Sequence, residues 1–341
     1  MPRTEALIFR PALEVSFEEF GILIPIADDR TSRVLASLRE AGVDTSRLVQ
    51  VVEEPLITRE DLLRVHEPSY VEDLFSSGLE RRLLEAYELV DERGGYVRYA
   101  PERASRPLSE LLTRVLLGAT CTYLACLRAL RAGHAFSCAG GYHHAHAGFG
   151  HGFCVINDVV IALRRLMAEG RIRRAWVVDV DVHKGDGTAA LTKDDPSIAT
   201  LSIHMAAGWP LSLPSTLPDG RPHPSHIPST VEIPVARGEE ARYHELLGEG
   251  LTRLEEHLPH PDLAVVVWGA DPYEKDELPS AAELSLSLEA LFERDLLLWE
   301  FMRAREVPAA FLMAGGYGPH AWEPFARFLR WVFQGEGNVN C

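Results

Sequence analysis

The chain has 341 residues, and 50 Asp and Glu against 34 Lys and Arg give it a formal net charge of -16 at pH 7. This acidity disfavours nucleic acid as a direct partner and would attract a cationic substrate. No unbroken apolar run approaches the roughly 18 residues of a membrane span, and the N-terminus lacks a signal-peptide pattern. We therefore expect a cytoplasmic protein without a membrane partner.

No stretch rich in Pro, Gly and Ser divides the chain, so we expect a single domain over residues 1–341, with 335–341 as a flexible tail. The cysteines lack Cys-x-x-Cys spacing, which argues against a disulfide framework and a thiolate zinc site. We expect buried, reduced thiols at Cys121, Cys126, Cys138, Cys154 and Cys341.

In the N-terminal third of the chain the sequence predicts short strands and helices that do not alternate regularly. We expect strands over 5–9 and 49–53, and helices over 31–40, from the Thr58 capping box onward, and over 70–92. A loop over 94–107 then leads into a long helix over 108–131, rich in Leu and Ala. Ser109 could cap this helix, and Gly133 would end it.

From residue 134 onward strands alternate with helices, which is the pattern of a parallel sheet and an α/β fold. Strands are expected at 134–138, 174–181, 198–203, 231–235, 263–268 and 309–313. Helices are expected at 155–169, 239–257, 285–305 and 321–333. The proline-rich segment 205–230 fits neither pattern, and loops of that length are usually functional or disordered.

The strand over 174–181 is the one around which we expect the chemistry. Its valine-rich run is typical of a strand buried on both faces, and it ends in acids, a histidine and glycines. Asp181 and His183 are two residues apart, so in an extended chain their side chains leave one face roughly 6 to 7 Å apart. An imidazole and a carboxylate suit zinc, which in a catalytic site needs a third protein ligand and an open position.

Other strands are followed by reactive side chains at equivalent positions. The tandem His143 and His144 follow the strand that begins at residue 134, Asp271 follows the strand over 263–268, and Tyr317 follows the last strand. Ligands of parallel sheets gather beyond the carboxyl ends of the strands, so these segments should meet. A structural ion site or a tight glycine turn would explain one such segment, but not their coincidence.

These side chains together provide what amide hydrolysis requires. One ion could be held by Asp181, His183 and Asp271. Such an ion lowers the pKa of water and polarises a carbonyl. A neighbouring histidine could take the proton of the water, oriented by Asp179 or Asp186, and Tyr317 could donate its hydroxyl to the developing oxyanion.

The sequence resembles the zinc-dependent histone deacetylase family, especially its bacterial and class IV-like members, over about residues 5 to 333. The motifs that carry the resemblance are Ala139-Gly-Gly-Tyr-His-His-Ala, Gly152-Phe-Cys-Val-Ile-Asn-Asp, Asp179-Val-Asp-Val-His-Lys-Gly-Asp-Gly, Gly269-Ala-Asp-Pro-Tyr-Glu and Ala314-Gly-Gly-Tyr-Gly. His66-Glu-Pro-Ser-Tyr is similar to an early His-x-Pro-x-Tyr segment of the family. The resemblance implies the arginase/deacetylase fold, a three-layer α/β/α single domain around a mostly parallel sheet of about eight strands.

The resemblance also implies roles for the site residues. Zinc, with iron(II) as the alternative in the cell, would bind Asp181, His183 and Asp271. His143 would pair with Asp179 and act electrostatically, while His144 would pair with Asp186 and act as the main proton shuttle. Tyr317 would polarise the acyl carbonyl.

Substrate contacts and a second ion follow from the same resemblance. Gly152 and Phe153 would line a narrow tunnel for the acyl-lysine stem, and Gly315 and Gly316 would bring the backbone close to the substrate. A structural potassium ion is expected, largely through backbone carbonyls, at Asp179, Asp181, His183, Ser202 and Ile203.

Some positions depart from the family pattern. Arg30 matches an arginine at an internal acetate-release channel, although Ala27-Asp-Asp-Arg replaces the usual His-Pro-Glu-Arg. Glu102 falls where many members use an aspartate to grip the substrate backbone. Trp209 is a bulky residue expected at the tunnel rim, and Lys184 stands where histidine or glutamine is common.

The leading functional hypothesis is hydrolysis of an acyl amide, in particular acetyl, on the ε-amine of lysine in proteins or peptides. Acetylpolyamines or other small acylated amines are the alternative substrates. A ureohydrolase would need a second metal held by extra aspartates, whereas Gly269-Ala-Asp-Pro offers one acid. A catalytically silent binding protein would not need all three ligands, both histidines and Tyr317. The oligomeric state is left open.

Overall fold

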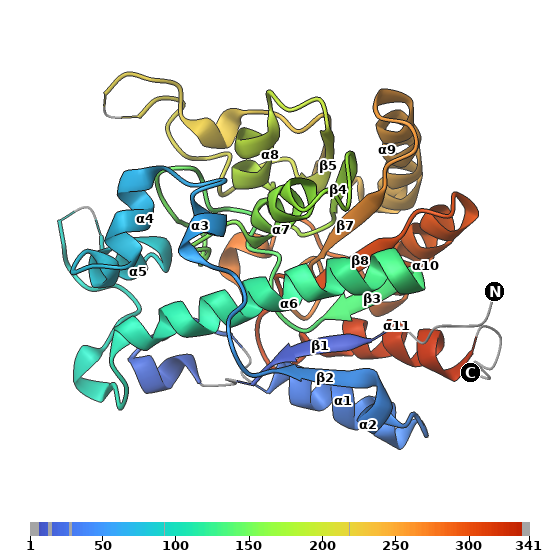
Figure 1. The fold of residues 1–341 in the computed structure, drawn as a ribbon, viewed down its shortest axis with the longest axis horizontal. Helices are drawn as coiled ribbons and strands as arrows, with labels where there is room; N and C mark the ends of the chain where they lie inside the picture. Colours follow the sequence, from blue (N-terminus) through green and yellow to red (C-terminus); the bar gives the residue numbers. More distant parts are fainter. Residues whose placement is uncertain (1–6, 13–15, 27–28, 92, 218, 336–341) are drawn as a thin grey trace.

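The computed structural model describes residues 7–12, 16–26, 29–91, 93–217 and 219–335. Three predictions fall outside these residues: the flexible tail beyond Gly335, the thiol of Cys341, and the place of residues 27 and 28, where the sequence differs from the family pattern. The sheet has eight strands in the order β2-β1-β3-β8-β7-β4-β5-β6 (Figure 1). All of its strand pairs are parallel, as the alternation of strands and helices predicted.

The strands are β1 Ile8–Pro11, β2 Val49–Val52, β3 His134–Ser137, β4 Ala175–Asp179, β5 Ile198–Met205, β6 Val231–Val235, β7 Leu263–Trp268 and β8 Ala309–Met313. The helices are α1 Arg30–Glu40, α2 Thr45–Leu48, α3 Arg59–Leu62, α4 Pro68–Leu74, α5 Leu79–Ala86, α6 Leu111–Ala132, α7 Asp158–Ala168, α8 Asp186–Thr192, α9 Tyr243–His257, α10 Leu288–Ala304 and α11 Glu323–Gln334. The first strand begins and ends later in the sequence than the predicted range 5–9, and helix α8 was not predicted.

Two hydrophobic layers sandwich the sheet, and alternate residues of each strand divide between them. Val177 of β4 faces the layer that contains α6 and α7, while its neighbour Val178 faces the layer formed with α1, α9, α10 and α11. Both residues are buried, which explains why the strand reads as a continuous apolar run. The result is the expected three-layer α/β/α arrangement.

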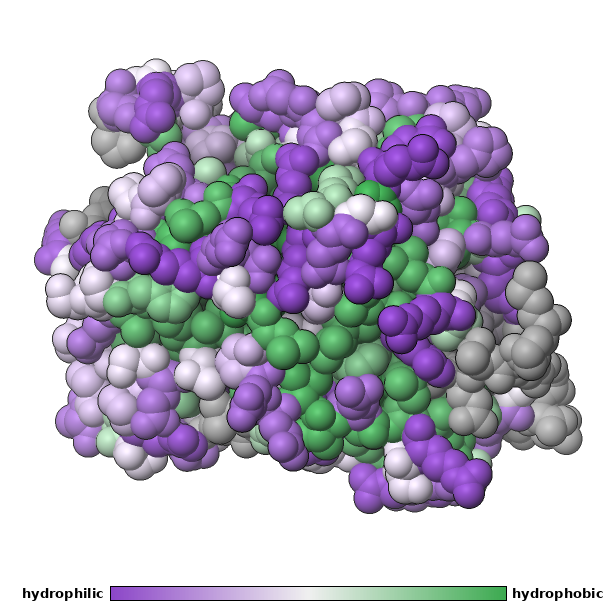
Figure 2. All heavy atoms as spheres, in the orientation of Figure 1, coloured by the Kyte–Doolittle hydropathy of each residue, from purple (hydrophilic) through white to green (hydrophobic). Residues whose placement is uncertain are grey.

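Helix α6 crosses the front of the sheet in Figure 1, and hydrophobic side chains gather along the middle of the same face in Figure 2. Leu108–Ala132 is long and apolar enough, by length and composition, to cross a membrane, but 61% of its most apolar window is buried inside the protein. It packs against β1, β3, β8 and α7. Such burial is typical of a core helix, and it explains the hydropathy of the segment.

Two predicted helices begin or end differently in the structure. The helix expected over 70–92 is two helices, α4 and α5, and it ends at Ala86. The chain turns at Gly78, where a Cβ atom would lie 2.6 Å from the Asp73 carboxylate. Ser109 does not cap α6, because it lies inside a 3₁₀ turn over Leu108–Glu110 and α6 begins only at Leu111.

Candidate active site

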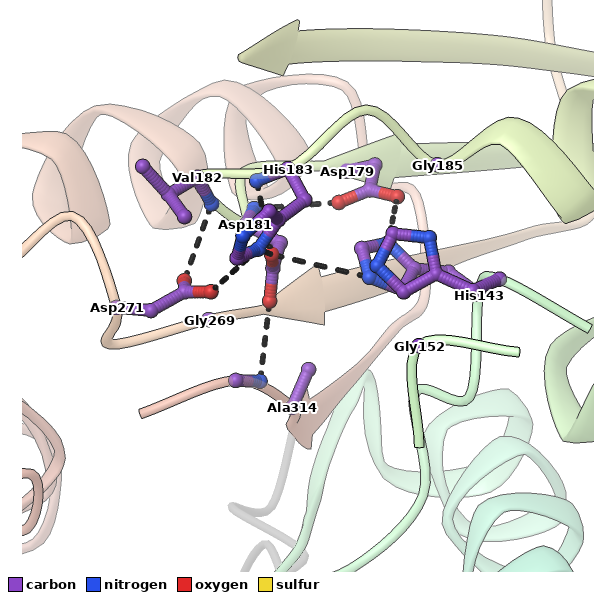
Figure 3. Close-up of polar contacts among 12 residues, drawn as sticks. His143, Gly152, Asp179, Asp181, Val182, His183, Gly185, Gly269, Asp271 and Ala314 are labelled. Carbon is purple, nitrogen blue, oxygen red and sulfur yellow. Dashed lines mark hydrogen bonds and ion pairs between the residues drawn. The ribbon is translucent and has the colours of Figure 1, made fainter. Parts of the chain in front are cut away.

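The strongest cluster of metal-ligating side chains lies where β4 and β7 end. β4 stops at Asp179, so Asp181 and His183 stand in the loop that follows rather than on the predicted extended strand. Asp271 comes from the loop after β7. His183 Nδ1 lies 3.2 Å from Asp181 Oδ1 and 3.2 Å from Asp271 Oδ2, and the three side chains point toward one another in Figure 3.

These three residues fit a divalent metal ion. Their donor atoms lie within 4.8 Å of one another, and all three side chains are buried. One imidazole and two carboxylates form a ligand set that suits zinc. Burial, and then the charge of Asp181, raise the pKa of Asp271 to about 7, so the cluster concentrates negative charge that a cation would neutralise.

Backbone and side-chain groups fix the atoms that face away from the cluster. Asp181 Oδ2 accepts a hydrogen bond from the Gly315 amide at 3.0 Å, and Asp271 Oδ1 accepts one from the Val182 amide at 3.0 Å. His183 Nε2 lies 3.2 Å from Ser280 Oγ, which leaves Nδ1 directed at the two carboxylates. Gly315 is required here, because a Cβ atom would lie 2.3 Å from Asp181 Oδ2.

Two histidine–aspartate pairs flank this cluster, and we call them the inner pair (His143 and Asp179) and the outer pair (His144 and Asp186). In each pair the histidine Nδ1 lies 2.7 Å from a carboxylate oxygen. Burial lowers the pKa of His143, but the charges of Asp179 and Asp181 outweigh this effect and raise it to about 9. Burial and the neighbouring His143 lower the pKa of His144 well below its ordinary value.

The pKa shifts give the two histidines different chemical capacities. The raised pKa of His143 favours its charged form, which can stabilise negative charge, whereas the lowered pKa of His144 favours its neutral form, which can accept a proton. Their ring centroids are 3.9 Å apart, and both side chains line the same cavity.

The loop that carries both histidines is held by buried polar residues at the start of α7. Asp158 accepts hydrogen bonds from the amides of Gly141 (2.9 Å) and Tyr142 (2.6 Å). The Asn157 amide group donates to the His143 carbonyl at 3.4 Å. The motif around residue 158 therefore orients the backbone of the tandem histidines, a role that its position in the sequence did not reveal.

The Asp186 carboxylate has more partners than the predicted one. Its Oδ2 atom accepts hydrogen bonds from Ser225 Oγ and from His146 Nε2, the latter at 3.1 Å. His151 Nε2 also lies 3.1 Å from this oxygen. Sequence reasoning missed all three residues, because Ser225 belongs to the irregular segment 205–230 and the two histidines have no informative spacing.

A cavity of about 170 Å³ extends from this centre into the protein. Tyr317, Phe153, Gly152, Gly315 and Gly316 all line it, together with His143, His144, Asp181 and His183. The rings of Phe153 and Tyr317 are 5.9 Å apart. Burial raises the pKa of Tyr317 well above its ordinary value, so its hydroxyl stays protonated and can donate a hydrogen bond.

Trp209 packs closely over the outer pair. Its ring lies 4.5 Å from the ring of His144 and 5.6 Å from that of His183. A Cβ atom on Gly152 would lie 2.3 Å from Trp209 and 2.6 Å from His144, and the backbone at Gly152 has φ +56°. This position therefore requires glycine. Trp209 is not among the described residues that line the cavity, so its place at the tunnel rim stays a prediction.

Arg30 reaches the opposite end of the cavity. Its guanidinium donates to the carbonyls of Ala314 (2.8 Å) and Met313 (3.1 Å) at the end of β8. It lines the cavity with Arg114. The N-terminal helix α1 thus supports the strand that leads to Tyr317.

The remaining predicted positions lie elsewhere. Glu102 is exposed in a 3₁₀ turn over Pro101–Arg103 and is not among the described residues that line the cavity. Ser202 Oγ accepts a hydrogen bond from the Gly185 amide at 3.3 Å, and Ile203 is buried in β5. The potassium site stays a prediction. Lys184 is buried in an ion pair with Glu232 at 2.8 Å.

Comparison with known proteins agrees with this geometry. The histone deacetylase domain matches residues 24–330. An uncharacterized protein of Picosynechococcus is 31% identical over 270 residues, covering 79% of each chain, and histone deacetylase 2 of Arabidopsis thaliana is 25% identical over 313 residues, covering 92% of this chain and 74% of the relative.

The fold is similar to that of solved structures as well. The crystal structure of an HDAC homolog complexed with SAHA superposes with a TM-score of 0.68 at 21% identity, covering 96% of this chain and 83% of the other. This likeness shows the arginase/deacetylase fold. The match over most of the sequence shows the family and its hydrolase activity. The chain belongs to the histone deacetylase family of metal-dependent hydrolases.

Proposed function

We propose that this protein removes an acyl group, in particular acetyl, from the ε-amine of lysine in proteins or peptides, with zinc as its metal. The observation that carries the proposal is the convergence of Asp181, His183 and Asp271 with two histidine–aspartate pairs at one end of a cavity. Iron(II) is the alternative ion, because the same ligands accept it.

When bound, the metal polarises the acyl carbonyl and lowers the pKa of water. His144, neutral and oriented by Asp186, takes the proton of the attacking water and returns it to the leaving amine. The His143 cation, held by Asp179, stabilises the negative charge that develops beside it. The Tyr317 hydroxyl donates a hydrogen bond to the developing oxyanion.

The cavity of about 170 Å³ favours a slender acylated chain, and the net charge of -16 favours a cationic molecule around it. Both features suit acyl-lysine and acylated polyamines alike. One observation favours the small amines: Glu102, the expected anchor for a peptide backbone, does not line the cavity. Small acylated amines are therefore the second candidate substrate.

A turnover panel followed by mass spectrometry tests both candidates. Metal-loaded protein is given acyl-lysine peptides with short and long acyl groups, and acetylated polyamines, with and without a chelator. Cleavage of peptides that the chelator abolishes supports the protein deacylase, and cleavage of polyamines alone supports the second candidate. Absence of turnover on every acylated amine, with the metal bound, would refute the proposal.

A further inference from the structure

A second group of metal-ligating side chains lies beside the outer pair, away from the cluster of Asp181, His183 and Asp271. His144, His151 and Asp186 present donor atoms that all lie within 4.8 Å of one another. Asp186 is fully buried, whereas the His151 side chain is 12% exposed. The group therefore reaches from the catalytic loop toward solvent, so a small ion could enter it.

The His151 imidazole has a contact that the hydrogen-bond network does not explain. Its Nε2 atom is buried and lies 3.1 Å from Asp186 Oδ2, but the contact does not have the geometry of a hydrogen bond. The same oxygen already accepts hydrogen bonds from Ser225 and His146, which use its two lone pairs. A buried nitrogen without a hydrogen bond is costly, and a cation bound by His151, His144 and the Asp186 oxygen that faces His144 would remove this cost.

The chemistry and spacing of these donors suit a divalent ion. Two imidazoles and a carboxylate are a common ligand set for zinc. Zinc–nitrogen bonds of about 2.0 to 2.1 Å place neighbouring ligands of a tetrahedral ion about 3.3 Å apart. Asp186 Oδ1 lies 2.7 Å from His144 Nδ1 and Asp186 Oδ2 lies 3.1 Å from His151 Nε2, so the two oxygens of one carboxylate face the two imidazoles.

We propose that His144, His151 and Asp186 form a second divalent-cation site, best matched by zinc, whose occupancy blocks proton transfer. Coordination through His144 Nδ1 replaces its hydrogen bond to Asp186 and leaves the proton on Nε2. That nitrogen then cannot accept a proton from water. The block of turnover rests on the proposed hydrolysis, whereas the cation site stands without it.

The test counts bound Co²⁺, a spectroscopic probe for zinc sites, by equilibrium dialysis and elemental analysis. We expect two ions per wild-type chain, one in Asp271→Ala, one in His151→Phe, and none in the double variant.

Phenylalanine at residue 151 keeps the ring that packs 5.1 Å from Trp209 but removes both nitrogens. His151→Gln is a second variant in case the first does not fold, as judged by circular dichroism. His226→Gln, an exposed histidine beside Ser225, is the matched control and should bind two ions.

One ion per wild-type chain, or two in either folded His151 variant, would overturn the second site. In the turnover assay, Zn²⁺ beyond one equivalent should inhibit the wild type and the His226→Gln control but not His151→Phe. Equal inhibition of all three proteins would overturn the proposed block. If the ion counts are as expected but no acylated amine is hydrolysed, the proposed function fails while the cation site remains supported.

Discussion

The inner and outer pairs have the same geometry and opposite electrostatics. Each holds a histidine Nδ1 2.7 Å from a carboxylate, yet the pKa of His143 is raised to about 9 and that of His144 falls well below its ordinary value. The difference lies in the neighbours. His143 Nε2 is 3.7 Å from a second carboxylate, Asp181, whereas His144 lies against the cationic ring of His143. The charges around a pair, and not its hydrogen bond, decide which histidine can act as a base.

The largest expected effect tests what the two pairs share, which is the proposed metal site between them. Asp271→Ala removes one of three proposed ligands but touches neither pair, so we expect this metal site to be empty and a loss of activity of more than about 1,000-fold. Elemental analysis should count one ion fewer than in the wild type, and a turnover assay measures the loss of activity. Ser280→Ala, which removes only the contact to His183 Nε2, should weaken metal binding by about 10- to 100-fold. Full metal occupancy in Asp271→Ala would contradict its place as a ligand.

The next prediction tests the difference between the pairs directly. His144→Ala should lower kcat by about 100-fold or more, because it removes the neutral base, while the metal stays bound. His143→Ala should lower kcat less, because it removes only a stabilising charge. Single-turnover kinetics on proteins loaded with one equivalent of metal compare the two. A larger loss for His143→Ala would reverse the roles that the electrostatics assign.

A third variant lies outside both pairs. Tyr317→Phe should lower kcat by about 100-fold, as expected for the loss of one oxyanion donor. Because Phe keeps the ring that packs 5.9 Å from Phe153, KM and metal content should change little. The pH dependence of kcat should also keep its wild-type acid limb, since His144 is untouched. An unchanged kcat would remove Tyr317 from the mechanism.

The smallest expected effect concerns the support beneath the outer pair. His66 is buried, and its Nδ1 atom lies 2.9 Å from the His146 carbonyl oxygen. Its Nε2 atom accepts a hydrogen bond from the backbone amide of Asn157 at 3.1 Å. Burial lowers its pKa from 6.5 to about 4. As the pH falls the unfolded chain takes up the proton first, so stability present above pH 6.5 is lost between pH 6.5 and 4.

This shift corresponds to about 3 kcal/mol of unfolding free energy. Urea unfolding at several pH values measures the loss, which should be smaller in His66→Gln, whose amide does not titrate. The same pH slope in both proteins would exclude His66 as its source.

The sequence was most informative where side chains follow buried strands. All eight strands were predicted within a few residues, because apolar runs mark them, and parallel topology then brought Asp181, His183 and Asp271 together. Contacts made by irregular loops could not be predicted in the same way. Ser225 Oγ donates a hydrogen bond to Asp186, and the Asp276 carboxylate accepts one from the Tyr317 backbone amide at 2.7 Å. Both contacts join loops that have no periodic sequence pattern.

The strand order has a consequence for how the chain is assembled during synthesis. β8 is the last strand to emerge, yet it lies between β3 and β7 and alone joins β2-β1-β3 to β7-β4-β5-β6. The nascent sheet therefore remains in two parts until about residue 313 has left the ribosome. His143 and His144 follow a strand of the first part and Asp181, His183 and Asp271 follow strands of the second, so we expect these two sets of side chains to meet only after β8 has been synthesised.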